Sequence, residues 1–164
     1  MQIAPLLQIK NVHATKPQSS VISLCKMPKP DIVVNTSQLR NAFKAHQKVY
    51  QNDKDNPSCQ LLLFYAVETG LKSLFLEKRK YRTTLDFQKA FGENKKYGHG
   101  HKILKWISEL KIAASHIAVF SDDESDPIEN VHEKLRYGST LSGNIGKNQI
   151  AYLRSIATYL SKNI

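Results

Sequence analysis

The chain has 164 residues, which is enough for one domain with a sizeable core. Its net charge of +10 favours polyanionic partners such as nucleic acid, although a basic protein that binds no polyanion is the alternative. Two cysteines, of which Cys59 lies in an apolar run, exclude a disulfide framework and indicate free thiols in a reducing compartment. Because the N-terminus lacks the pattern of a secretory signal, we expect a cytoplasmic protein.

Residues 1–34 show no sustained helical period and contain four prolines. Two short apolar runs, Ile3–Ile9 and Val21–Leu24, could be strands or extended arms. We therefore expect residues 1–34 to form an extended N-terminal arm that contacts a partner or stays disordered.

Apolar residues recur on one helical face from about Ser37 to Asn52, after three residues that can cap a helix: Asn35, Thr36 and Ser37. A polar turn follows, and Ser58 is the predicted cap of a second helix, Ser58–Lys80. The two helices should form an antiparallel hairpin.

The second helix is apolar on every side in its middle, so other elements or lipid must surround it. Polar residues interrupt the apolar stretch, which falls short of the roughly 18 to 20 residues of a membrane span. We expect the central helix of a bundle and no membrane partner. Within it, Glu68 can pair with Lys72 one turn later.

The remaining elements are expected in the following order: a short helix within Thr83–Gly92 capped by Thr84, a loop to Gly100, a helix over His101–Lys111, a helical or extended Ile112–Phe120, an acidic loop over Ser121–Asp126, a short helix over Ile128–Tyr137, a small-residue loop over Ser139–Gly146, and a last helix over about Lys147–Asn163. Residues 35–164 should therefore form one all-α domain, a four- to five-helix up-and-down bundle.

Four segments in this order, QLRNAFKAHQKVY, LLLFYAVETGLKSLFLEKRK, GHGHKILKWISEL and HEKLRYGS, make the chain similar to the HEPN superfamily of prokaryotic helical bundles. Ala66–Lys72 and His101–Leu104 carry most of the likeness. The resemblance implies a bundle that is often dimeric and occurs in toxin–antitoxin, abortive-infection and CRISPR-linked systems. Many members are metal-independent ribonucleases with an Arg-x4-6-His motif, and others bind RNA or a partner without cleaving.

The chain has one match to that motif, Arg40 with His46, which the resemblance implies as a catalytic pair. A histidine can move the 2′-hydroxyl proton, and an arginine can stabilise the charged transition state, so no metal or other cofactor is expected. Six positions on an ideal helix leave two side chains roughly 120° apart. The alternative is therefore a core-facing His46 beside a solvated Arg40.

Two further groups are candidates for RNA binding. Arg136 could hold a phosphate and Tyr137 could stack on a base, unless Arg136 pairs with Glu68 or with the acidic loop. A basic cluster could follow a phosphate backbone or be a solvated helix end: Lys78, Arg79, Lys80 and Arg82. The histidines at positions 99 and 101 match no standard zinc spacing, so no metal site is predicted.

The sequence thus predicts a HEPN-like RNA-binding protein of a prokaryotic antiviral-defence or toxin–antitoxin system, acting as a metal-independent endoribonuclease if it is active. RNA and either a protein partner or a second copy of the chain are the expected partners. The alternative is a non-catalytic helical subunit that scaffolds a CRISPR-type ribonucleoprotein or partners a nucleotidyltransferase.

Overall fold

The computed structural model describes residues 32–93, 98–120, 126–141 and 143–164, all within one compact unit, Ile32–Ile164. Within these ranges the chain forms six α-helices and no β-strand, which confirms the predicted all-α fold. The expected N-terminal arm, up to residue 31, and most of the expected acidic loop lie outside the described residues.

The first helix, α1 (Thr36–Asn52), begins at Asn35, one of the three caps that the sequence allows. The side-chain oxygen of Asn35 accepts a hydrogen bond from the backbone N–H of Gln38 at 2.8 Å. In return, Gln38 Oε1 accepts from the backbone N–H of Asn35 at 2.9 Å, which completes a capping box. The buried face of α1 consists of Leu39, Phe43 and Tyr50.

The second helix, α2 (Pro57–Arg79), follows α1 after a short turn. The predicted cap Ser58 is wrong, because the side chain of Asn56 accepts from the N–H of Ser58 at 2.8 Å. Pro57 takes the first helical position, where its missing N–H costs nothing. The helix ends at Lys80, which has a left-handed backbone with φ of 56°.

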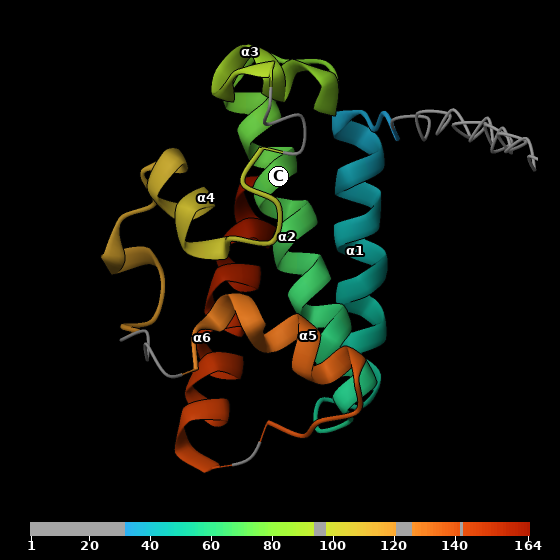
Figure 1. The fold of residues 1–164 in the computed structure, drawn as a ribbon, viewed down its shortest axis with the longest axis vertical. Coiled ribbons are helices and arrows are strands. Elements are labelled where there is room, and N and C mark those ends of the chain that lie inside the picture. The colour runs from blue at the N-terminus through green and yellow to red at the C-terminus, as the bar shows by residue number, and fades with distance from the viewer. Residues whose placement is uncertain (1–31, 94–97, 121–125, 142) are drawn as a thin grey trace, which may run out of the picture. The chain divides into compact units, whose positions relative to one another are not determined.

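Helix α2 is the centre of the unit and packs against α1, α4 (Ile103–Leu110), α5 (Val131–Arg136) and α6 (Gly143–Asn163). Figure 1 shows α2 in green running beside α1, with α4, α5 and α6 on its other sides. By length and composition alone α2 could cross a membrane, but 61% of its most apolar 18-residue window is buried inside the protein. The apolar surface that required a covering is therefore covered by other helices.

The segment after α2 contains a 3₁₀ turn, η1 (Thr84–Asp86), followed by α3 (Phe87–Phe91). The predicted cap Thr84 is wrong, since its hydroxyl oxygen accepts from the backbone N–H of Val34 at 3.1 Å. The N-cap is Thr83, in a capping box with Asp86, whose Oδ2 accepts from the N–H groups of Arg82 and Thr83 at 2.9 and 3.1 Å.

The remaining elements differ from the prediction mainly at their ends. His101 precedes α4 and lies in a turn, and Ile112–Phe120 contains only a 3₁₀ turn, η3 (Ala114–His116). The short helix α5 follows another 3₁₀ turn, η4 (Ile128–Asn130). Helix α6 begins four residues before the predicted Lys147, and Gly146 allows this start because a Cβ there would lie 2.7 Å from the Leu141 carbonyl carbon.

Candidate functional site

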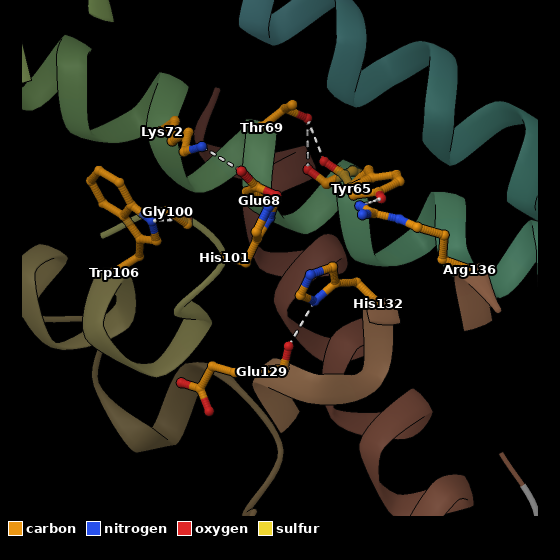
Figure 2. Close-up of polar contacts among 11 residues, drawn as sticks. Tyr65, Glu68, Thr69, Lys72, Gly100, His101, Trp106, Glu129, His132 and Arg136 are labelled. Atoms are coloured by element: carbon orange, nitrogen blue, oxygen red, sulfur yellow. Dashed lines mark hydrogen bonds and ion pairs between the residues drawn. The ribbon is translucent and has the colours of Figure 1, made fainter. Parts of the chain in front are cut away.

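Helix α2 places a carboxylate inside the bundle at Glu68, which is only 6% exposed. Its Oε1 pairs with the ammonium group of Lys72, as the sequence predicted. Its Oε2 lies 2.7 Å from Nδ1 of His101, on the turn before α4 (Figure 2). Two cationic or polar partners thus compensate for burial of the charge.

The His101 ring is fixed at one nitrogen and open at the other. A carboxylate oxygen only accepts, so Nδ1 of His101 donates to Glu68, and Nε2 is the remaining basic position. The His101 side chain is 47% exposed, and the described residues include no hydrogen-bond partner for Nε2. This arrangement of carboxylate, imidazole and open nitrogen is the one that orients a general base.

The turn that carries His101 is held in place by Trp106. The buried indole Nε1 of Trp106 donates to the carbonyl oxygen of Gly100 at 3.0 Å. Gly98 lies so close that a Cβ there would be 2.6 Å from the indole ring. The packing of α4 against α2 therefore determines where His101 meets Glu68.

A second imidazole, His132 of α5, is buried beside the first. Its ring centroid lies 4.3 Å from that of His101 and 5.0 Å from that of Phe64. Nδ1 of His132 donates to the carbonyl oxygen of Glu129 at 2.7 Å. Burial lowers the pKa of His132, although the hydrogen bond to the Glu129 carbonyl opposes this shift.

Arg136 closes this side of the bundle at the end of α5. Its Nη2 donates to the hydroxyl oxygen of Tyr65 at 2.6 Å, and this hydrogen bond raises the pKa of Arg136. The Tyr65 ring lies 6.5 Å from that of His101 and 6.3 Å from that of His46. Arg136 thus bonds to Tyr65, and neither Glu68 nor any other described acid pairs with it.

These side chains form a group that we call the α2 polar cluster: Tyr65, Glu68, Lys72, His101, His132 and Arg136. It combines a half-exposed imidazole, a carboxylate that orients it, and two cations. Among the described residues no group of three or more His, Cys, Asp or Glu side chains could hold a metal ion. The chemistry that the cluster can perform by itself is proton transfer beside a stabilised anion.

No protein-family model, curated protein or solved structure matches this chain.

The structure separates the two residues predicted as a catalytic pair. Arg40 donates through Nη2 to Oε2 of Glu77 at 2.8 Å, whereas the ring of His46 lies beside Tyr65. Glu77 and Tyr65 are twelve positions apart on α2, which is about 18 Å along the axis. His46 thus reaches the edge of the α2 polar cluster, and burial lowers its pKa. Arg40 contacts the far end of α2.

The residues predicted to bind RNA fall into two places. Tyr137 is 80% exposed and follows Arg136 directly. At the other end of α2, Lys78 Nζ donates to the carbonyl oxygen of Leu110 at 3.3 Å, and Arg79 Cζ lies 5.5 Å from the centroid of the Phe75 ring.

A shallow hollow of about 430 Å³ is lined in part by Lys78, Arg79, Lys111 and Glu109. Lys80 and Arg82 are exposed and lie nearby in the chain. The Lys80 backbone closes α2, so its role is also structural. The basic cluster is therefore an exposed helix end beside this hollow.

Sequence reasoning did not assign a role in catalysis to His101, His132 or Tyr65. The signal for His101 was present, because a carboxylate in an apolar helix must find partners and Lys72 alone leaves one oxygen unpaired. Tyr65 lay in an apolar run and His132 in a short polar helix, where nothing local distinguishes them.

Proposed function

We propose that the chain is a HEPN-like RNA-binding protein of a prokaryotic antiviral-defence or toxin–antitoxin system, and that its α2 polar cluster cleaves RNA without a metal ion. The observation that carries the proposal is the half-exposed His101 imidazole, held through Nδ1 by the buried Glu68 carboxylate at 2.7 Å. The net charge of +10 supports a polyanionic substrate.

In this proposal Nε2 of His101 takes the proton from a 2′-hydroxyl group, and Glu68 stabilises the imidazolium that forms. The 2′-oxygen attacks the adjacent phosphorus, and the bond from phosphorus to the 5′-oxygen breaks. The products are a 2′,3′-cyclic phosphate and a 5′-hydroxyl end. The leaving 5′-oxygen takes its proton from solvent.

Arg136 is the proposed anion-stabilising group. Its bond to Tyr65 uses one of five N–H donors, and the planar fork retains the others for a phosphate. His132 packs on the ring of His101 and is a positioning residue, as is Glu68. Tyr137, next to Arg136, is the proposed stacking surface for a base.

An expression test separates this assignment from the Arg40–His46 pair. Wild-type protein should arrest growth and fragment cellular RNA, and His101→Ala should abolish both effects while Arg40→Ala preserves them. Full activity of His101→Ala together with loss of activity in Arg40→Ala would favour the motif pair and contradict the assignment of catalysis to the α2 polar cluster.

A non-catalytic helical subunit, as a scaffold in a CRISPR-type ribonucleoprotein or as a nucleotidyltransferase partner, is the second candidate. The exposed apolar side chains of Ile32, Val119 and Tyr137 favour it, because such groups are commonly covered in assemblies. This candidate predicts that wild-type protein leaves RNA intact and co-purifies with a defined protein partner from its own host.

A further inference from the structure

A second cationic hollow lies between α1 and α6. It has a volume of about 180 Å³ and shares no lining residue with the α2 polar cluster. Its polar lining comes from Gln47, Tyr50, Gln51, Lys54, Arg154 and Thr158. The described residues that line it include no aspartate or glutamate, although two cations face it.

The guanidinium group of Arg154 is pre-oriented there by a buried phenol. Its Nε donates to the hydroxyl oxygen of Tyr50, and its Cζ lies 5.7 Å from the centroid of the Tyr50 ring. No described carboxylate pairs with Arg154, so its two terminal amino groups remain available. A guanidinium fixed in this way loses little freedom when it binds an anion through two parallel hydrogen bonds.

The other polar groups divide into those that are used and those that are available. Gln47 exchanges hydrogen bonds with Ser161 at 3.0 and 3.3 Å, and the Thr158 hydroxyl donates to the carbonyl oxygen of Arg154 at 2.9 Å. Lys54 and Gln51 therefore supply the further donors. The hollow combines one fixed fork, one flexible cation and one amide without a competing acid.

We propose that this hollow binds a phosphate dianion, as free inorganic phosphate or as the terminal phosphate of a nucleotide. A volume of about 180 Å³ is below the roughly 300 to 1,000 Å³ of sites that enclose a whole small molecule, so the hollow takes the phosphoryl group alone. The inference is independent of the proposed ribonuclease function, since it uses neither His101 nor Arg136.

Isothermal titration calorimetry of the full chain tests the proposal, with inorganic phosphate, adenosine 5′-monophosphate and adenosine as probes. Wild type should bind phosphate saturably at one site per chain and should not bind adenosine. Arg154→Gln should weaken phosphate binding about tenfold or more, the value of a charge-assisted hydrogen bond. Lys147→Gln is the matched control, since it removes one exposed positive charge from the same helix.

Two further variants separate binding from folding. Arg154→Lys keeps the charge but loses the fork, and Tyr50→Phe keeps the ring but loses the acceptor for Nε; each should weaken binding while circular dichroism stays unchanged. Tighter binding of adenosine 5′-monophosphate than of phosphate assigns the site to phosphate esters, and equal binding assigns it to the free ion. Absence of saturable binding to wild type, or equal weakening by Arg154→Gln and Lys147→Gln, would overturn the proposal.

Discussion

Glu68 shows how one buried carboxylate can determine both stability and the geometry of a site. One of its oxygens binds Lys72, which is on α2 itself. The other binds His101, which is on the turn before α4. Glu77, on the same helix, forms a comparable pair with Arg40, but the side chains of Glu77 and Arg40 are 51% and 34% exposed. The two glutamates therefore allow a direct comparison of a buried ion pair with an exposed one.

We predict that Glu68→Gln lowers the free energy of unfolding by about 2 kcal/mol, because the partly buried Lys72 ammonium loses its charged partner. Glu77→Gln should cost less than about 1 kcal/mol, since solvent screens an exposed pair. Urea unfolding of both variants measures the difference. Equal losses would contradict the claim that burial makes the Glu68 pair the stronger one.

The lowered pKa of His132 makes the stability of the fold depend on pH, and the sign of this dependence follows from burial. Its pKa is lowered in the folded protein, so the unfolded chain takes up a proton first as the pH falls through about 6.5. Stability is therefore retained above that value and lost toward the lower folded pKa.

His132→Asn removes the titrating group, and its amide nitrogen can still donate to the Glu129 carbonyl. We expect the thermal midpoint to fall less between about pH 7.5 and about pH 5.5 in this variant than in wild type. An identical fall in the two proteins would show that His132 does not titrate differently on folding.

At the scale of elements, the close approach of α2 to its neighbours depends on Gly70. A Cβ at this position would lie 2.8 Å from Leu160 Cδ1 of α6 and 2.9 Å from Phe43 Cδ2 of α1. The glycine is thus the point at which three helices meet, and its lower helix propensity is the cost of that contact.

Gly70→Ala should destabilise the protein by about 1 to 2 kcal/mol, because overpacking exceeds the gain of about 1 kcal/mol in helix propensity. Leu160→Val removes the nearest methyl group, so the same glycine substitution should cost less in that background. A stabilising Gly70→Ala would show that α1 and α6 can move apart freely.

Local pattern predicted the helices well and the site poorly, for physical reasons that particular residues make clear. One-face spacing identified α1 and α6, and the all-round apolar surface of α2 identified the centre of the bundle. The contacts in the α2 polar cluster span 33 residues for Glu68 with His101 and 71 for Tyr65 with Arg136. Such pairs depend on tertiary packing, which no spacing rule contains.

The catalytic prediction from the motif illustrates the same limit. Arg40 and His46 have the spacing of the motif, but Arg40 pairs with Glu77 near the C-terminal end of α2, whereas the ring of His46 lies beside Tyr65 nearer the middle of that helix. Helix ends were also mispredicted, since Asn56 and Thr83 are the caps where Ser58 and Thr84 were expected. Several residues in each turn can cap, and packing decides which one does.

At the scale of the whole molecule, the excess of 24 basic over 14 acidic side chains should make the proposed RNA binding strongly dependent on salt. If Lys78 and Arg79 each contact a phosphate of single-stranded RNA, the double variant Lys78→Gln/Arg79→Gln should lower the slope of log affinity against log salt by about 1.4. Lys147→Gln/Lys162→Gln removes the same charge from exposed positions of α6 and should change the slope little. Equal changes would mean that net charge, and not the α2 end, determines binding.

The central claim is that the cluster around His101 cleaves RNA by itself. The most direct test incubates purified protein with a defined RNA in the presence of EDTA and identifies the chemistry of the new ends. Wild type and His116→Ala, which removes a histidine of η3 outside the α2 polar cluster, should produce 2′,3′-cyclic phosphate ends, and His101→Ala should produce none. Cleavage by His101→Ala at the wild-type rate, or intact RNA with all three proteins, would contradict the account.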